Sequence, residues 1–124
     1  MTIAEVSRKY DISADTLRYY ERIGLIPPVT RDKSGFRNYT EADCNWVEFI
    51  KCMRNATVSI EALAEYVSLF QAGDATHDAR KALLEEQLAG LDRNIAEMHA
   101  GRERLAWKIA HYDDRMKEVE DGLL

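Results

Sequence analysis

A heptad repeat runs through the last third of the chain and constrains its fold more than any other feature. Apolar side chains recur at alternating spacings of four and three residues, and Arg102 is the only charged residue in the series. The full seam is Leu84, Leu88, Leu91, Ile95, Met98, Arg102, Leu105, Ile109, Tyr112, Met116 and Val119. A repeat of this length predicts a coiled-coil helix from Thr76 to about Tyr112, with a short final helix after it.

This helix needs a partner to cover its seam. It would be about 55 Å long at 1.5 Å per residue, too long to bury its seam against the preceding 70 or so residues. An intramolecular hairpin would need a turn at Gly90 or Gly101, and neither glycine has neighbours typical of a turn. We therefore expect a homodimer, most simply two-fold. The predicted dimerisation residues are Leu84, Leu88, Leu91, Ile95, Met98, Leu105 and Ile109.

The first 72 residues contain signals for four short helices. Thr2 with Glu5 forms a capping box, and Ser13, Thr40 and Ser59 each precede a helical pattern. The predicted helices end near residues 10, 23, 55 and 71. Gly24 and the Pro27-Pro28 pair stop the second one. Two short helices joined by a tight turn form a helix-turn-helix.

Residues 29–39 are polar and contain a Ser-Gly turn. Short segments at 29–31 and 36–39 are expected to pair as a β-hairpin, which would make the motif winged. The predicted fold is mainly α, with a winged helix-turn-helix domain at 1–72 and a coiled-coil dimerisation helix at 73–124.

The distribution of charge permits nucleic-acid binding, although the net charge is −5. Residues 1–58 hold nine Lys and Arg against eight Asp and Glu, whereas residues 59–124 hold eight against fourteen. Within 7–39 the count is seven against four, which leaves a modest basic face.

Other classes of function find little support in the sequence. No apolar run is long enough to span a membrane, and the N-terminus lacks a signal core, so we expect a cytoplasmic protein. There is no Gly-rich phosphate loop and no evident catalytic grouping, so neither an enzyme nor a cofactor is expected. His77, His99 and His111 lack the spacing that shares a metal, and no metal site is expected.

The stretch TLRYYERIGLIPP places several DNA-contacting side-chain types on the second predicted helix. Arg18 offers a planar fork for phosphate or guanine, Tyr19 a hydroxyl for phosphate, and Thr16 a short donor near base edges. Lys33 and Arg37 on the wing are placed to reach a neighbouring phosphate or a minor groove. An ordinary amphipathic helix with solvated arginines is the alternative, and the wing and dimer arm favour DNA binding.

The segment from TIAEVS through SADTLRYYERIGLI to GFRNY resembles the DNA-binding head of the MerR family of regulators. This resemblance implies an antiparallel homodimer on double-stranded promoter DNA. The dimer would distort an over-long spacer and so act on RNA polymerase indirectly, through the DNA. The contacts that the resemblance implies are Thr16, Arg18, Tyr19, Arg37, Tyr39 and Arg54. The full set of predicted DNA contacts also includes Tyr20, Lys33 and Asn38. Thr57 departs from the family, which usually has glycine there. The chain ends at Leu124, so no separate ligand-binding domain is expected after the coiled coil.

Two cysteines bear on what such a regulator would sense. Cys44 and Cys52 lie about 12 Å apart along one predicted helix, too far for a disulfide. On a helical wheel Trp46, Phe49, Ile50 and Met53 form the core face, and both cysteines point away from it. Lys51 and Arg54 would favour a Cys52 thiolate. A packing role for Cys52 remains the alternative from spacing alone.

The stretch WVEFIKCMRNA with SIEALAEY resembles the AdhR/NmlR-type, aldehyde- and thiol-stress-responsive branch of the family. The resemblance implies that formaldehyde, methylglyoxal or a related electrophile reacts with Cys52. The alternatives are a regulator that responds to a metal or to a non-covalent ligand, or an architectural DNA-binding protein, with Cys52 structural.

Overall fold

The computed structural model describes all residues, 1–124, and the chain is built almost entirely from helices. Its contacts divide it into two compact units, Met1–Gln87 and Leu88–Leu124. The boundary between them falls inside the long helix and not near residue 72. The reason is that the start of this helix belongs to the head: Leu83 packs against the head core, and the Gln87 side chain accepts a hydrogen bond from the Ser59 amide at 3.4 Å.

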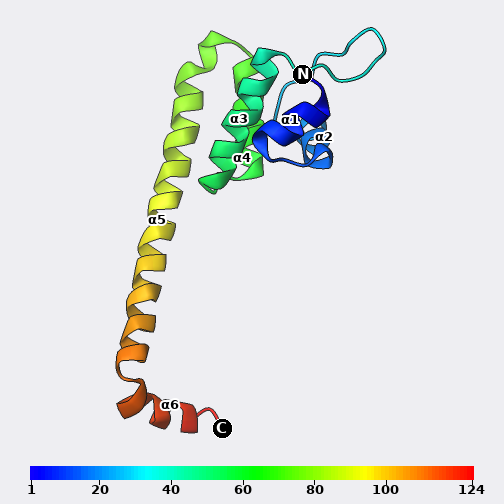
Figure 1. The fold of residues 1–124 in the computed structure, drawn as a ribbon. Helices are drawn as coiled ribbons and strands as arrows, with labels where there is room; N and C mark the ends of the chain where they lie inside the picture. The colour runs from blue at the N-terminus through cyan, green and yellow to red at the C-terminus, as the bar shows by residue number, and fades with distance from the viewer. The chain divides into compact units, whose positions relative to one another are not determined.

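The first unit holds four α-helices, shown in Figure 1. They are α1 (Ile3–Tyr10), α2 (Ala14–Arg22), α3 (Glu41–Asn55) and α4 (Ile60–Gln71). A 3₁₀ turn, η1 (Asp74–Thr76), leads into α5 (His77–Ala110). The predicted helices and the helix-turn-helix are confirmed.

Local capping chemistry explains why these helices begin where they do. Thr2 forms a capping box with Glu5, and Thr40 forms one with Asp43. Ser13 and Ser59 each accept a hydrogen bond from the backbone three residues later. Gly24 follows α2 at φ 79°, a left-handed conformation that favours glycine.

The core of the first unit lies between α1, α2, α3 and α4, and Val6, Leu17, Val47, Ile50 and Leu63 are fully buried in it. The helical-wheel prediction for α3 was wrong about Cys44, which is only 6% exposed and lies 3.9 Å from the Met1 sulfur. Trp46 and Phe49 are half-buried instead. The buried arc of α3 is wide because α1 and α4 both contact this helix.

The wing is a tight loop with less strand pairing than the sequence predicted. A single antiparallel bridge joins Arg31 to Arg37, and no strand forms. The Asp32 carboxylate shapes the turn by accepting hydrogen bonds from the Ser34 and Phe36 amides at 2.9 and 3.0 Å. Pairing stops at Tyr39 because its amide donates to the Met1 carbonyl.

The second unit contains the remainder of α5 and two further turns. A π-helical turn, η2 (Tyr112–Met116), follows α5, and α6 (Lys117–Asp121) follows that. The expected break near Tyr112 and the short final helix are both present. None of the residues of α5 is buried. No helix is long and apolar enough to cross a membrane.

Candidate nucleic-acid interface

The exposed face of α2 carries three of the predicted DNA contacts. The Thr16 hydroxyl accepts a hydrogen bond from Ser13 at 2.8 Å, which leaves its own proton free to donate. Arg18 is half-exposed and contacts Asp15 at 3.0 Å, a surface pair that another anion can replace at little cost. The Tyr19 ring is 37% exposed, and the Arg22 guanidinium lies 5.3 Å from its centre.

Glu21, on the inner side of α2, joins this helix to the wing. One carboxylate oxygen accepts a hydrogen bond from Arg37 Nε at 2.7 Å, and the other accepts one from the Val29 amide at 2.9 Å. Partial burial alone would raise the pKa of Glu21, but these two hydrogen bonds outweigh it and hold the pKa below its usual value. No sequence motif predicts this role for Glu21, since its partners lie 8 and 16 residues away.

The wing presents further polar side chains to solvent. Lys33 is exposed at its tip, and Phe36 beside it is 72% exposed. Arg37 is largely covered where it pairs with Glu21. The Asn38 side chain is exposed and accepts a hydrogen bond from the Met1 ammonium at 3.2 Å.

Two tyrosines of the predicted contact set are less accessible than expected. Tyr39 is 2% exposed, so its ring is part of the core in this conformation and not an exposed wing contact. Its hydroxyl has no hydrogen-bond partner, and burial raises the pKa of this group. Tyr20 is half-buried against the same core. Both tyrosines are required by packing, which a linear motif does not reveal.

The start of α2 and the end of α3 meet at a polar hollow of about 300 Å³. Thr16 and Arg54 both line it, so the structure brings together two contacts predicted from distant parts of the sequence. Lys51 and Asn55 also line this hollow, and the sequence analysis gave neither a DNA-binding role. Lys51 lies three residues before Arg54 and four residues before Asn55. This spacing places all three near the last turn of α3 and was the available signal.

The two cysteines differ in accessibility. Cys52 is exposed on α3, whereas Cys44 is buried, so Cys52 is the only thiol that a reagent in solvent can reach directly. The two cations near Cys52 are engaged with backbone carbonyls. Lys51 donates to the carbonyl of Tyr10, the last residue of α1, and Arg54 donates to Val58 at 2.8 Å in the turn before α4.

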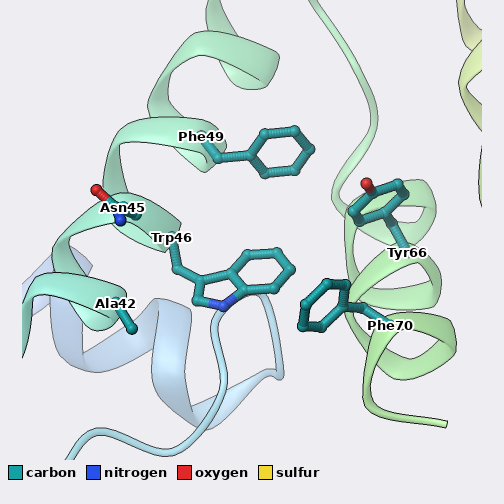
Figure 2. A pocket seen from close by; sticks show the side chains of 6 residues that line it. All are labelled: Ala42, Asn45, Trp46, Phe49, Tyr66 and Phe70. Carbon is teal, nitrogen blue, oxygen red and sulfur yellow. The ribbon is translucent and has the colours of Figure 1, made fainter. Parts of the chain in front are cut away.

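An aromatic pocket of about 290 Å³ lies between α3 and α4 (Figure 2). Trp46 and Phe49 face Tyr66 and Phe70 across it, and Ala42 and Asn45 complete its lining. The Trp46 and Phe70 rings meet edge to face at 5.0 Å. Helix periodicity does not reveal this pocket, since it predicts that Trp46 and Phe49 belong to the core.

The predicted dimerisation residues are largely solvent-exposed in the single chain. Leu84 and Leu91 are partly covered, and the other five are 56–75% exposed: Leu88, Ile95, Met98, Leu105 and Ile109. His77 is exposed at the start of α5. No group of three or more His, Cys, Asp or Glu side chains is arranged to hold a metal.

Comparisons with known proteins agree with this geometry. Residues 1–69 match the model of the MerR HTH family regulatory proteins, and residues 45–108 match a second model described as MerR, DNA binding. The HTH-type transcriptional regulator AdhR of Bacillus subtilis is 59% identical over 87 residues, which cover 70% of this chain and 62% of AdhR. The chain thus spans less than two thirds of the length of that relative.

Two solved structures are similar in fold over nearly the whole chain. A MerR family transcriptional regulator from Listeria monocytogenes has a TM-score of 0.85 and 44% identity, with 99% of this chain and 93% of that chain covered. HiNmlR, a MerR family regulator lacking the sensor domain and solved bound to promoter DNA, has a TM-score of 0.78 and 33% identity. Those alignments cover 94% of this chain and 92% of HiNmlR.

Proposed function

Because this chain belongs to the MerR family of helix-turn-helix transcriptional regulators, in the AdhR-like branch, we propose that it binds a promoter as a homodimer and activates transcription in response to reactive aldehydes. The regulator class excludes an enzyme. The dimer, the mode of activation and the aldehyde are the proposed parts, and each has its own support.

The DNA-binding surface consists of the exposed face of α2, the wing and the hollow beside Arg54. Thr16, Arg18 and Tyr19 enter the major groove, while Lys33 and Arg37 reach the flanking backbone. Glu21 supports this arrangement because it fixes Arg37 and the wing relative to α2. HiNmlR, which shares this fold, was solved on promoter DNA.

The dimer activates by changing the shape of the DNA. Two heads joined through their α5 helices hold two half-sites at a fixed spacing, and a change in that spacing bends or twists the DNA between them. Such a mechanism depends on the deformability of the spacer as well as on base contacts. RNA polymerase then responds to the altered promoter without needing a direct contact with the regulator. The regulator acts in the cytoplasm.

The exposed thiol of Cys52 is the observation that supports aldehyde sensing. The thiolate attacks the carbonyl carbon of formaldehyde, a carbon–sulfur bond forms as the carbonyl π bond breaks, and the resulting oxyanion takes a proton from water. The product is an S-hydroxymethyl adduct. No oxidant or reductant is consumed in this step.

Cys52 also lies where a change can reach the helix-turn-helix and the turn before α4. Its neighbours Lys51 and Arg54 hold the C-terminal end of α1, which leads into α2, and the turn before α4 through their hydrogen bonds to Tyr10 and Val58. An adduct between these two side chains shifts one or both of them, and with them the position of α2.

Intact-mass spectrometry together with DNA footprinting tests this proposal. Formaldehyde should add one hydroxymethyl group to the wild type, and the footprint should gain distortion at the centre of the site. Cys52→Ala should show neither change, while Cys44→Ala, in which only the buried thiol is lost, should behave as wild type. An unmodified Cys52, or a footprint that changes equally in Cys52→Ala, would refute aldehyde sensing at this residue.

The aromatic pocket supports a second candidate, a non-covalent inducer. A flat apolar molecule fits a pocket of about 290 Å³ lined by four rings, and it would contact α3 and α4 together. Fluorescence of a Trp107→Phe variant, in which Trp46 is the remaining tryptophan, distinguishes the two candidates, because an inducer in the pocket changes the emission of Trp46 and an adduct at Cys52 leaves the pocket empty.

A further inference from the structure

We propose that two copies of α5 pair antiparallel in one particular register, in which the residue numbers of facing seam positions add up to 193. Ile95 of one copy then lies opposite Met98 of the second copy. Leu88 lies opposite Leu105, and Leu84 lies opposite Ile109. The inference rests on the proposed homodimer and specifies which residues of the two copies meet.

The seam requires an occupant that matches its length and spacing. In the single chain, Ile95, Met98 and Ile109 are 56%, 75% and 68% exposed. Apolar side chains that recur along one helix face are stabilised by removal from water, and a second copy offers the same spacing along its own helix.

Arg102 decides the relative direction of the two helices. A parallel pair places equivalent residues side by side, so the two Arg102 side chains would face each other within the seam. An antiparallel pair places Arg102 opposite a different residue. In the proposed register that residue is Leu91, which the aliphatic stem of Arg102 can cover while its guanidinium stays in water, 3.0 Å from Glu103 of its own chain.

Only certain antiparallel registers superpose the seam on itself. A two-fold axis pairs each residue with another so that the two numbers have a constant sum. Near the middle of α5, alternating spacings of four and three match in reverse order only for sums of 186, 193 and 200. Other sums bring seam positions opposite residues on the solvent side.

The two neighbouring registers make poorer pairs. A sum of 186 places Lys81 opposite Leu105 and His77 opposite Ile109. A sum of 200 places Leu88 and Leu84 opposite Tyr112 and Met116, which lie in the π-helical turn after α5 ends at Ala110. The sum of 193 keeps Leu84, Leu88 and Ile95 opposite apolar residues of the straight helix.

Charges beside the seam point to the same register. With a sum of 186, the two-fold axis passes beside residue 93. Asp92 of each copy then lies next to this axis, and two like charges close together are unfavourable. A sum of 193 places Asp92 near His99 of the second copy and Gln87 near Lys108, so Asp92 does not face a second acid.

Paired cysteines test the register directly. The background variant is Cys52→Ala, which removes the exposed thiol and leaves Cys44 in the core. Leu88→Cys with Leu105→Cys reports the sum of 193, Leu88→Cys with Met98→Cys the sum of 186, and Leu91→Cys with Ile109→Cys the sum of 200. Each protein is oxidised mildly and run on a non-reducing gel, and its mass before oxidation is measured by sedimentation.

We expect the first pair to form a covalent dimer in most of the protein, at least tenfold more than the other two pairs. The single variants Leu88→Cys and Leu105→Cys should not cross-link, since each residue lies far from its own copy across the axis. Preferential cross-linking of either alternative pair overturns the register, and so does equal cross-linking of all three.

Duplex binding by the same proteins separates this inference from the proposed function. A dimeric, DNA-binding protein that cross-links only in another register leaves the regulator intact and refutes the sum of 193. A monomeric protein without DNA binding refutes both the register and the homodimer on which it rests.

Discussion

At the scale of single residues, Glu21 holds the wing against α2 through hydrogen bonds from Arg37 and Val29. We predict that Glu21→Gln lowers the free energy of unfolding by roughly 1.5–3 kcal/mol at pH 7, as expected for hydrogen bonds to a charged group. Because the folded-state pKa of Glu21 is below its ordinary value of 4.5, this stabilisation is present above pH 4.5 and is lost as pH falls through the folded-state pKa.

Urea unfolding of both proteins at pH 7 and at pH 3 measures this effect. The difference between wild type and Glu21→Gln should shrink at the lower pH. Glu48→Gln, which changes an exposed acid on α3, serves as the matched control and should show little difference at either pH. If Glu21→Gln lowers the free energy of unfolding by the same amount at pH 7 and at pH 3, the charge of Glu21 is not what holds the wing.

Thr57 carries backbone strain in the turn between α3 and α4. Its φ is 68°, a left-handed conformation that is costly for a β-branched residue, and its side chain is exposed. Thr57→Gly should therefore raise the free energy of unfolding by about 1 kcal/mol. This is the net effect of relieving the strain in the folded state and of the greater flexibility of glycine in the unfolded chain, which acts in the opposite direction.

Thermal unfolding of Thr57→Gly against Gly24→Ala provides a paired test. Gly24 has φ 79° with open space around it, so Gly24→Ala should lower the melting temperature through backbone strain alone. A Thr57→Gly protein that melts below the wild type would show that the Thr57 side chain supports the turn.

The predictability of the site also differs residue by residue. Arg18, Tyr19 and Cys52 are exposed where their motifs placed them, because their exposure follows from helix periodicity. Tyr39 was misjudged and Glu21 overlooked, because the burial of one and the partners of the other arise from segments distant in sequence. Linear spacing carries no information on such contacts.

At the scale of elements, the helices were predicted closely because their signals are local. A threonine or serine caps each of α1 to α4, an acid three residues later completes the cap of α1 and α3, and a glycine follows α2 and α4, all without tertiary contacts. The wing was predicted less well. Its closure depends on Asp32 and on the capture of Tyr39 by Met1, and so no strand forms.

The seam of α5 leads to a prediction about this element alone. Ile95→Lys should weaken dimerisation at least tenfold, since it places a charge in the middle of the predicted interface. The head should unfold as in wild type, because Ile95 is 56% exposed in the single chain and lies outside the first unit.

Sedimentation equilibrium measures the dimer dissociation constant, and urea unfolding monitored by Trp46 emission in a Trp107→Phe background measures the stability of the head. Ala96→Lys places the same charge one residue away on the solvent side of α5 and is the matched control. If Ile95→Lys stays as dimeric as Ala96→Lys, the seam does not form the dimer contact.

At the scale of the whole molecule, a net charge of −5 has to be reconciled with DNA binding. The excess acid lies after residue 58, so the head can contact phosphates locally. We predict that duplex binding weakens as the salt concentration rises. Arg54→Gln should reduce the steepness of the plot of log binding constant against log salt concentration by about 1.8, because one phosphate contact is lost in each half of the dimer at about 0.9 per contact.

Fluorescence anisotropy on a labelled promoter duplex gives these slopes. Arg93→Gln, which removes a charge of the same sign from α5, should leave the slope at its wild-type value. A slope that Arg54→Gln does not change would remove Arg54 from the phosphate contacts and assign it only to its hydrogen bond with Val58.

Transcription in vitro from the promoter upstream of the gene for this protein tests the central claim most directly. Wild type, Cys52→Ala and Cys44→Ala are each compared with and without formaldehyde, with RNA polymerase present throughout. We predict that formaldehyde raises transcript levels with wild type and Cys44→Ala and leaves Cys52→Ala at its basal level. Equal induction with Cys52→Ala would contradict the account and move the sensor to another site, with the aromatic pocket beside Trp46 the first to examine.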